Sequence, residues 1–412
     1  MKVAILKETN PRETRVACSP EIVKKMIAQG IDVRVETGAG TASSFQDEQF
    51  KAAGAIVTKT PRETLANADV VFCVRQPDPK SLESLAKKAL VASLLSSDEK
   101  EINAYLDSLE KHKLSAIALE YIPRISRAQS MDVLSSQANL AGYRSVIDAV
   151  YEYGRAFPMM MTAAGTVPPA KVLIVGAGVA GLQAIATARR LGAVVSAFDV
   201  RAAAKEQVES LGAKFIEVES DDAGDESGSE TKGGYAKESS EAYKKRQAEK
   251  LAEAVSKHDI VITTALIPGK PAPRLISKEM VDSMKPGSVL VDLALERGGN
   301  IEGSAAEKII SKNGKKIIGF TNFAGRLAAE SSSLFARNCF HLLSLMFDKD
   351  KKELSIDQSD EIIKGSLIVL NGQRIHPNFT TAPSSDSSKK SQTQKGKAKN
   401  PAPKKATAAK GD

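Results

Sequence analysis

The sequence predicts an α/β protein with two Rossmann-like domains, each built on a doubly wound parallel sheet. Three observations support this fold class. Short apolar runs rich in β-branched residues alternate with segments of helical periodicity, and the alternation occurs in two separate series along the chain. A further apolar helical pattern follows the second series. We therefore expect the chain to return to the first domain near its end, so that the second domain is inserted into the first.

The first series is expected to contain six strands. They cover residues 3–6, 32–36, 55–57, 69–74, 89–94 and 115–120. Helical segments lie between them, and the segment at 19–29 has Ser19 as its expected N-cap and Pro20 at its first helical position. Strands that alternate with helices in this way are typical of a parallel sheet.

The second series also contains six expected strands, at residues 171–175, 194–199, 214–218, 259–264, 288–293 and 316–320. A helix over 135–156 is long enough to cross from one domain to the other, and the apolar helix over 336–347 is expected to pack against the first domain. We therefore expect a first domain over 1–134 that is completed by 326–379, and a second domain over 135–325.

The basic charge of the chain is concentrated at its end. The formal net charge is +8, and residues 380–412 carry eight lysines against two aspartates, so the rest of the chain is nearly neutral. A nearly neutral body gives no reason to expect a nucleic-acid-binding fold. The tail has almost no large apolar residue and is expected to be disordered. The alternative is an electrostatic attraction to an anionic membrane or an acidic partner.

The cysteines and the hydropathy pattern restrict the class of protein further. Cys18, Cys73 and Cys339 are far apart and odd in number, so they predict neither a disulfide framework nor a zinc site, and no metal is expected. A reducing cytoplasm fits this usage. The sequence has no run of about 18 apolar residues, so the chain is not expected to span a bilayer. Its first residues are typical of a strand rather than a signal peptide.

The strongest functional motif is a glycine-rich turn directly after the strand at 171–175. Gly176 is expected to make the tight turn, Gly178 to let a pyrophosphate approach the backbone, and Gly181 to let the next helix pack on the strand. The N-terminus of that helix supplies N–H donors and positive potential. The spacing predicts a dinucleotide site, and a glycine-rich turn that binds nothing is the alternative.

The next strand ends on Asp199, 18 residues after Gly181, where a carboxylate can accept hydrogen bonds from both ribose hydroxyls. The same carboxylate would repel a 2′-phosphate, so NAD(H) is the expected cofactor rather than NADP(H). Arg201 follows two residues later, where an arginine can contact a 2′-phosphate. Because Asp199 is present, we expect Arg201 to contact the adenosine side instead.

A polar run at 124–136 follows the last strand of the first series, at the edge where α/β sheets bind ligands. Gln129, Asp132 and Ser135 recur every three residues and are expected to share one face of a helical turn. Together with Arg124 they can donate hydrogen bonds to, and accept them from, a carboxamide such as that of nicotinamide. The alternative is a polar interdomain loop in which Asp132 caps a helix.

Further segments are candidates for the cofactor crevice. Residues 217–230 are acidic and rich in glycine and serine, which predicts a mobile surface loop. Just after them, residues 232–238 place paired glycines before Tyr235, a composition suited to a lid over a nucleotide and equally to an exposed loop. Residues 263–269 follow a strand of the second sheet, so their backbone is expected to line the same crevice.

Several common catalytic motifs are absent from the sequence. None of the four histidines adjoins a candidate site, and GxSxG, HExxH and Walker-type patterns do not occur. A dehydrogenase that acts on an alcohol or an amino acid normally needs a proton acceptor beside the nicotinamide. The sequence offers no histidine for that role.

Longer motifs resemble a known family. The shared start of alanine dehydrogenases and nicotinamide nucleotide transhydrogenases is similar to residues 7–9, 13–17 and 19–21 (KET, ETRVA and SPE). The NAD(H)-binding soluble domain of proton-translocating transhydrogenases is similar to RISRAQSMDVLSSQANLAGY (124–143), MMMTAAGTVPPAKVLIVGAGVAGLQAIATARRLGA (159–193) and VITTALIPGKPAPRLIS (261–277). The resemblance extends from Met1 to about Phe379.

This resemblance implies that a hydride passes directly from NADH on this chain to NADP⁺ on a separate NADP(H)-binding subunit. It further implies coupling to proton movement through a membrane subunit. Neither subunit is contained in this sequence. A homodimer is implied as well, located in the cytoplasm and held peripherally at the bacterial inner membrane through the complex. Exchange between two nicotinamides removes no substrate proton, so catalysis would consist mostly of positioning and exclusion of water.

The same resemblance assigns residues to the cofactor. The nicotinamide half would be contacted by Arg124, Ile125, Ser126, Gln129, Ser130, Met131 and Asp132, with Ser135 in support. Pyrophosphate and adenosine would be held by Val179, Asp199, Val200 and Arg201, and the pocket would be completed by Gly234, Gln247 and Leu266, with Tyr235 at the tip of the mobile loop. The expected catalytic group consists of Arg124, Gln129, Asp132, Ser135 and Tyr235.

Alanine dehydrogenase is the alternative function. That family carries a substrate-binding lysine where this chain has Arg75, a catalytic histidine where it has residues 92–96 (ASLLS), and a catalytic aspartate near Glu296. These departures disfavour an amino-acid substrate. A nucleotide-sensing module without a catalytic partner is a further alternative.

Overall fold

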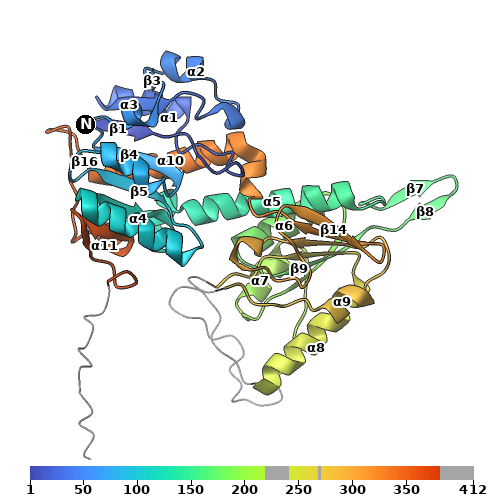
Figure 1. Cartoon of the computed structure of the whole chain (residues 1–412). Helices are drawn as coiled ribbons and strands as arrows, with labels where there is room; N and C mark the ends of the chain where they lie inside the picture. Colours follow the sequence, from blue (N-terminus) through green and yellow to red (C-terminus); the bar gives the residue numbers. More distant parts are fainter. Residues whose placement is uncertain (219–240, 268–270, 381–412) are drawn as a thin grey trace, which may run out of the picture.

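The structure is a computed structural model that describes residues 1–218, 241–267 and 271–380. Two α/β lobes lie side by side, and the long helix α5 (Val133–Glu152) runs from the first to the second (Figure 1). A second connection, helix α10 (Ala328–Met346), returns the chain to the first lobe. The predicted α/β fold, with the second sheet domain inserted into the first, is confirmed.

The first lobe contains an eight-stranded sheet of order β19-β18-β6-β5-β4-β1-β2-β3. Six parallel strands match the predicted ones within one or two residues at each end: β1 (Lys2–Ile5), β2 (Asp32–Glu36), β3 (Ile56–Thr58), β4 (Val70–Arg75), β5 (Leu90–Leu94) and β6 (Ser115–Ala118). Two antiparallel strands that were not predicted, β18 (Leu367–Leu370) and β19 (Gln373–Arg374), extend the sheet. The strand order reverses between β1 and β4, which is where a doubly wound sheet forms its ligand crevice.

The second lobe contains a seven-stranded sheet of order β11-β10-β9-β12-β13-β15-β14. Six strands match the predicted ones: β9 (Lys171–Val175), β10 (Val194–Phe198), β11 (Lys214–Phe215), β12 (Ile260–Thr263), β13 (Val289–Asp292) and β15 (Lys315–Gly319). The seventh, β14 (Lys308–Lys312), is an antiparallel edge strand that was not predicted. The strand order reverses between β9 and β12, so this lobe has a crevice of its own at that point.

Helices cover both faces of each sheet, so alternate side chains of the central strands enter separate cores. The remaining α-helices are α1 (Pro20–Ala28), α2 (Asp47–Ala52), α3 (Pro61–Leu65), α4 (Glu99–His112), α6 (Val179–Arg190), α7 (Ala204–Ser210), α8 (Glu241–Lys257), α9 (Lys278–Ser283) and α11 (Glu361–Ser366). The 3₁₀ helices are η1 (Thr41–Ser43), η2 (Pro79–Ser84), η3 (Leu119–Tyr121), η4 (Ser126–Met131), η5 (Leu295–Arg297) and η6 (Ala324–Leu327). As predicted, Ser19 caps α1 and accepts a hydrogen bond from the backbone N of Ile22.

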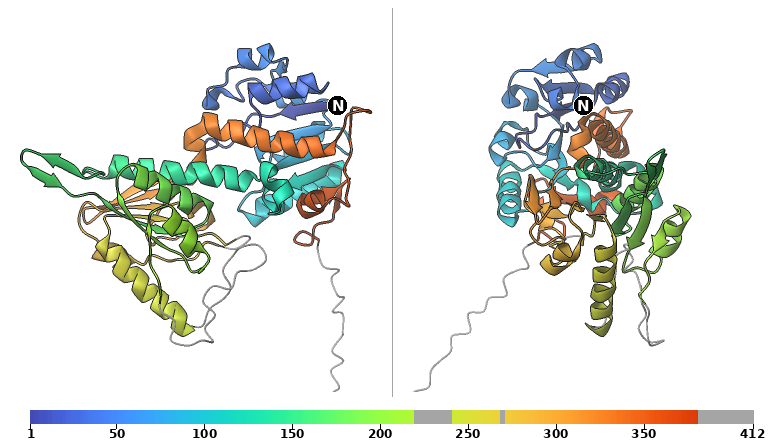
Figure 2. Two further views of the ribbon diagram at one scale, coloured as in Figure 1. Left: turned by 180° about the vertical axis from the view of Figure 1, so that it is seen from behind. Right: turned by 90° about the vertical axis from the view of Figure 1, so that its right-hand side faces the viewer.

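The two connecting helices differ in extent from the predicted ones. Helix α5 begins two residues before 135 and ends at Glu152, and α10 begins at Ala328 rather than 336. Helix α10 lies along the first lobe (Figure 2) and buries Phe335 and Leu342 in its core, as predicted. The domain boundaries themselves, 134/135 and 325/326, stay a prediction.

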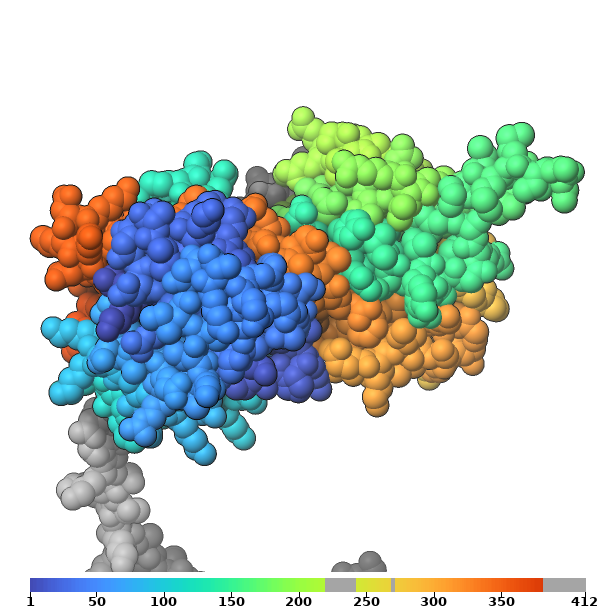
Figure 3. Space-filling model, turned by 90° about the horizontal axis from the view of Figure 1, so that it is seen from above, coloured from blue at the N-terminus to red at the C-terminus, as the bar shows by residue number. Residues whose placement is uncertain are grey.

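A hairpin arm projects beyond the second lobe. Strands β7 (Met160–Thr162) and β8 (Gly165–Val167) pair antiparallel and extend well past the body of the molecule (Figures 1 and 3). Its Met161 side chain is 81% exposed. The arm was not predicted, and neither was the short pair β16 (Phe347–Asp348) and β17 (Glu353–Leu354).

Three predictions concern segments or properties that the fold only partly addresses. The tail beyond Thr380, most of the acidic stretch 217–230 and the candidate lid 232–238 lie outside the described residues. Within the described part of the chain, no helix has the length and apolar character needed to cross a membrane. All three cysteines are buried free thiols.

Candidate functional site

The glycine-rich turn joins the end of β9 to the start of α6. Gly176 has a φ of +99°, and a Cβ there would lie 2.7 Å from Thr264 Oγ1. A Cβ on Gly181 would lie 1.8 Å from the carbonyl oxygen of Gly176, so α6 packs on β9 only because this residue is glycine. Gly178 is different, since it caps α6 with a φ of −78° and a Cβ there would meet nothing within 4 Å. Open space therefore lies in front of the N-terminus of α6, where a pyrophosphate binds in this class of turn.

Asp199 ties this turn to the end of β10. Its Oδ2 accepts a hydrogen bond from the backbone N of Ala177 at 2.6 Å, and its Oδ1 accepts one from the backbone N of Arg201 at 2.8 Å. The Nε and Nη2 atoms of Arg201 each lie 3.0 Å from a carboxylate oxygen of Asp199. The predicted ribose acceptor thus lies beside the turn with its charge balanced by Arg201. The exposed Val179 and Val200 add apolar surface next to these two groups.

The segment after β12 lies against the glycine-rich turn. Thr264 Oγ1 donates a hydrogen bond to the carbonyl of Gly176 at 3.0 Å, so the two elements meet where the strand order reverses. Leu266 and Ile267 are exposed beyond this contact. The described part of 263–269 therefore lines the crevice, as predicted.

Two buried polar residues that sequence reasoning missed hold this segment. Asn300 is fully buried; its Oδ1 accepts a hydrogen bond from the backbone N of Ala265 at 3.1 Å, and its Nδ2 donates to the carbonyl of Ala265 at 2.9 Å. Asp292, at the end of β13, accepts from the backbone N of Asn300 at 3.1 Å. Their signal in the sequence was a polar residue at each end of a loop that contains the pair Gly298 and Gly299.

The polar run in the first lobe forms η4 and the start of α5. Asp132 is the N-cap of α5: its Oδ1 accepts from the backbone N of Ser135 at 2.9 Å, and its Oδ2 accepts from Ser135 Oγ at 2.5 Å. Its backbone is extended, so the helix is interrupted there and Gln129 belongs to η4. The expected single helical face through Gln129, Asp132 and Ser135 is wrong, because the capping geometry breaks the turn.

The solvent side of this loop carries its polar groups. Exposed residues of the loop are Arg124, Ser126, Gln129 and Ser130. Met131, expected to contact the cofactor, instead lies in the core of the first lobe, and Ile125 packs half-buried against that core. Asn338 of α10 donates to the carbonyl of Ser130 at 2.8 Å and fixes the loop from behind.

Three predicted cofactor residues are not brought to this point by the described structure. Gly234 and Tyr235 lie outside the described residues. Gln247 is half-buried on α8. Their assignment to the site rests on the family resemblance.

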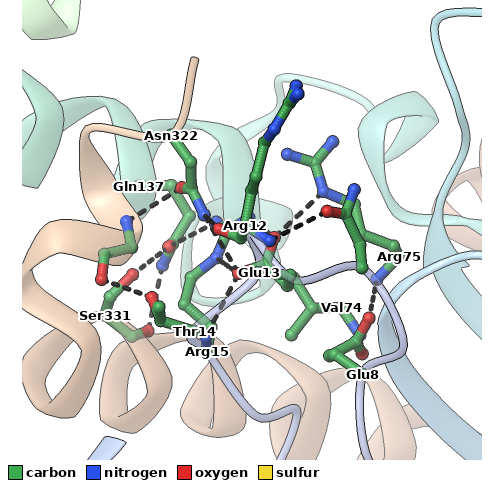
Figure 4. Close-up of polar contacts among 12 residues, drawn as sticks. Glu8, Arg12, Glu13, Thr14, Arg15, Val74, Arg75, Gln137, Asn322 and Ser331 are labelled. Carbon is green, nitrogen blue, oxygen red and sulfur yellow. Dashed lines mark hydrogen bonds and ion pairs between the residues drawn. The ribbon is translucent and has the colours of Figure 1, made fainter. Parts of the chain in front are cut away.

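A cavity of about 760 Å³ lies between the lobes, at the carboxyl ends of both sheets. Residues that follow β1, β2, β4 and β5 line it from the first lobe, and residues that follow β13 and β15 line it from the second. At its centre are Glu8, Glu13 and Arg75 of the first lobe, close to Asn322 of the second (Figure 4). The sequence placed Glu8, Glu13 and Arg15 only in the family's opening motif and offered no reason to expect them together.

Glu13 is the buried anion of this cluster, with 1% of its side chain exposed. Arg15 Nε and Nη2 each donate to it at 2.6 Å, and Arg75 Nε donates at 3.0 Å. Burial alone would raise the pKa of Glu13, but the two guanidinium groups outweigh it and lower the pKa to about 2. Arg15 Nη1 also donates to Gln137 Oε1 at 2.9 Å (Figure 4). The cluster therefore consists of matched charges.

Glu8 occupies the crevice between β1 and β4. Its Oε1 accepts from the backbone N of Val74 at 2.6 Å and its Oε2 from the backbone N of Arg75 at 3.2 Å. Burial, with a smaller contribution from the charge of Glu13, raises the pKa of Glu8 to about 7. A protein carboxylate thus takes the backbone donors that an anionic ligand would use at this switch point.

Among the described residues, no histidine lines the cavity. His112 ends α4, and His341 lies within α10. His258 lies with Nδ1 2.6 Å from the carbonyl oxygen of Ala254, and His376 packs against Tyr121. The structure agrees with the prediction that none of the four adjoins a candidate site.

Two protein-family models match this chain. The model "Alanine dehydrogenase/PNT, N-terminal domain" matches residues 4–141, and "Alanine dehydrogenase/PNT, C-terminal domain" matches residues 145–377. The chain belongs to the alanine dehydrogenase/PNT family. The resemblance found in the sequence motifs is thereby confirmed.

Within this family, the chain is similar to proteins of both kinds. It is 53% identical to the first of the polypeptides that make up NAD(P) transhydrogenase subunit alpha in Rhodospirillum rubrum, over 92% of this chain and 99% of that protein. The solved structure of a transhydrogenase from Sinorhizobium meliloti is 49% identical, with a TM-score of 0.77, over 92% of this chain and 100% of that one. An alanine dehydrogenase of Mycobacterium tuberculosis is 31% identical over 74% of this chain and 75% of that protein.

Proposed function

We propose that this chain is the NAD(H)-binding component of a proton-translocating NAD(P) transhydrogenase. The observation that carries the proposal is the combination of an open cradle at Gly178 with a cleft whose described lining contains no histidine. The first feature suits a pyrophosphate, and the second suits a reaction that removes no substrate proton. Similarity to transhydrogenase subunits over nearly their whole length supports the same conclusion.

The described residues fit NAD(H). Gly178 leaves room at the N-terminus of α6, and Asp199 places a carboxylate beside the same turn for the ribose hydroxyls. That carboxylate disfavours a 2′-phosphate, so NADP(H) is assigned to the partner subunit. Arg201 already pairs with Asp199 and is proposed to face the adenosine side.

Catalysis in this proposal is positioning. When bound, NADH supplies a hydride, which the oxidised nicotinamide on the partner subunit accepts. The exposed Arg124 and Gln129 are proposed to bind the carboxamide of the nicotinamide, and Ser135 holds Asp132 in the orientation needed for the same task. Gly234 and Tyr235 are proposed to complete the pocket. None of these groups has to transfer a proton.

The cleft argues against alanine dehydrogenase. A carboxylate substrate would need a cation to bind it, but Arg15 and Arg75 are both paired with Glu13 inside the protein. An amino-acid substrate would also need a proton acceptor. Ser96, within the segment that aligns with that family's histidine, donates to Glu101 at 2.6 Å and is no base.

The partners follow from the same proposal. They are an NADP(H)-binding subunit, a membrane subunit that translocates protons, and a second copy of this chain, with the complex at the cytoplasmic face of the bacterial inner membrane. The hairpin arm supports a homodimer, because it carries Met160 and Met161 into solvent and Tyr151 of α5 is 85% exposed. No nucleic acid is expected as a partner.

A reconstitution tests the proposal. The purified chain is mixed with the NADP(H)-binding subunit of a transhydrogenase, NADH and an NADP⁺ analogue whose reduced form absorbs at its own wavelength. Reduction of the analogue that requires both proteins is the expected result. Oxidation of NADH by pyruvate and ammonium with this chain alone would instead establish an amino-acid dehydrogenase. NADH binding without either reaction would leave a nucleotide-sensing module.

A further inference from the structure

One side chain bridges the two lobes across the cleft. Arg75 stands at the end of β4, with Nε 3.0 Å from Glu13 Oε2 in its own lobe and Nη1 2.5 Å from Glu296 Oε1 in the other. Glu296 lies in η5, on the loop that follows β13. The guanidinium therefore makes an ion pair from the first lobe to the second.

The first-lobe end of this bridge is held rigidly. Glu8 binds the backbone N of Arg75, so the main chain is fixed at the point where the side chain leaves it. Glu13 binds the guanidinium from within, and is itself fixed by Arg15, whose side chain is 4% exposed (Figure 4). The Glu296 side chain, by contrast, is 39% exposed. Arg75 is thus a preset donor, and Glu296 is the partner that arrives or leaves when the lobes move.

The second-lobe end is connected to the cofactor crevice. Asp292 Oδ1 binds the backbone N of Ala294, just before η5, at 3.0 Å and the backbone N of Asn300 just after it at 3.1 Å. Asn300 in turn holds both the N and the carbonyl of Ala265. The loop that carries Glu296 and the segment that precedes Leu266 therefore move as one unit with the floor of the cofactor crevice.

Other contacts between the lobes lie on the hinge itself. Thr14 Oγ1 donates to the carbonyl of Gly325 at 2.5 Å, and Asn322 Nδ2 lies 3.2 Å from Glu13 Oε1. Both second-lobe residues belong to the connection that runs through η6 into α10. Contacts at a hinge leave the opening angle free, whereas a contact on the η5 loop limits it.

We propose that Arg75 and Glu296 form an interlobe latch, a positioning pair that holds the cofactor-lining segment of the second lobe in place against the polar η4 loop of the first. This inference rests on the proposed function, in which the adenosine half of the cofactor binds the second lobe and the nicotinamide half reaches the first. The latch does not touch the reacting atoms. It sets how often the two halves of the site are in register before the cofactor binds.

The size of the effect follows from the exposure of the pair. An ion pair with one partner 39% exposed shifts an open–closed equilibrium by about two- to five-fold. A ligand that spans the cleft must close the lobes itself when the latch is lost, so its dissociation constant rises by the same factor. A ligand confined to the second lobe is unaffected.

Two variants and one control isolate the latch. Glu296→Gln removes the interlobe charge and leaves Arg75 on Glu13, while Arg75→Gln removes the bridge from the other side. Arg374→Gln is the matched control, because Arg374 also bridges two carboxylates, Asp107 and Glu110, but entirely within the first lobe. Spin labels on cysteines introduced at the exposed Lys24 and Lys285 report the distance between the lobes in the full-length chain. The three native thiols are buried and do not compete for label.

Two measurements follow on each variant: the interlobe distance distribution without ligand, and dissociation constants for NADH and for ADP-ribose, which lacks the nicotinamide. We expect Glu296→Gln and Arg75→Gln each to broaden the distribution toward longer distances and to weaken NADH by about two- to five-fold, with ADP-ribose unchanged. We expect the double variant to go no further than the single ones, and Arg374→Gln to match the parent chain.

Distance distributions identical to the parent in both latch variants would overturn the proposal. Equal weakening of NADH and ADP-ribose would also overturn it, because that result locates the damage within the second lobe. The proposed function fails by a different result, the absence of hydride transfer by the parent chain with its partner subunit. The distance measurement decides the latch in that case too.

Discussion

The glycine at the N-cap of α6 provides a direct test of the cofactor site. Gly178 has a φ of −78° and a ψ of −168°, a backbone conformation open to any residue, and a Cβ there would meet nothing within 4 Å. Nothing in the folded chain therefore requires glycine at this position. A ligand that approaches the backbone closely does require it, so Gly178→Ala separates a requirement of the fold from a requirement of binding.

The expected magnitudes differ in sign. Replacing glycine with alanine at an unstrained position removes entropy from the unfolded chain, so the free energy of unfolding stays the same or rises by about 0.4–1 kcal/mol. A methyl group in front of the helix N-terminus displaces the pyrophosphate from its N–H donors. The loss of one hydrogen bond to a charged group, about 1.5–3 kcal/mol, raises the dissociation constant of NADH by roughly 10- to 100-fold.

Urea unfolding monitored by circular dichroism gives the stability, and quenching or enhancement of NADH fluorescence gives the affinity. Gly154→Ala is the matched control, because a Cβ at Gly154 also meets nothing within 4 Å and this residue lies at the end of α5, away from the turn. Both variants are expected to unfold like the parent chain, and only Gly178→Ala is expected to lose NADH. Parental NADH affinity in Gly178→Ala would refute the placement of the pyrophosphate at this turn.

Three further outcomes are expected. Gly142→Ala places a Cβ 2.1 Å from the carbonyl oxygen of Ala180, so α5 and α6 must separate and urea unfolding is expected to show a loss of about 2–3 kcal/mol; an unchanged midpoint would contradict this. Asn300→Ala leaves both backbone groups of Ala265 unpaired in a buried site, so the same assay is expected to show a loss of about 2–4 kcal/mol, together with weaker NADH binding. Glu8 has its pKa raised from 4.5 to about 7, so it favours folding fully below pH 4.5 and this contribution, about 3 kcal/mol, is lost as the pH rises to 7. Urea unfolding across that range is expected to show this decline in the parent chain and not in Glu8→Gln; parallel curves would show that Glu8 ionises normally.

The sequence predicted the strands and their order of appearance because the buried strands of a doubly wound sheet are continuous apolar runs that have no other use. It failed for strands that are edges. β14, β18 and β19 are short, half polar and antiparallel, so their placement depends on a neighbour that already exists rather than on their own pattern. The hairpin arm failed for a related reason, since its residues pack against nothing in the described chain.

The candidate site divides in the same way. The glycines and Asp199 were predicted because one local segment must satisfy turn geometry, helix packing and charge at once. Met131 was placed on the cofactor by resemblance alone, and the structure puts it in the core. Residues such as Glu13 and Asn300 act through partners far along the chain, and their partners become visible only when the fold brings them together.

The two lobes present the same architectural feature to one cleft and use it differently. Each sheet reverses its strand order at a crevice, between β1 and β4 in the first lobe and between β9 and β12 in the second, and both carboxyl edges line the cavity. In the second lobe the crevice is left open by Gly178. In the first lobe, Glu8 takes the backbone donors and Glu13 neutralises the arginines. A crevice filled by the protein's own carboxylates cannot compete for an anionic substrate, so the first lobe serves as a rigid platform that presents the η4 loop and Arg75 to the nucleotide lobe. An enzyme whose second substrate is carried by another subunit needs such a platform more than it needs a second pocket.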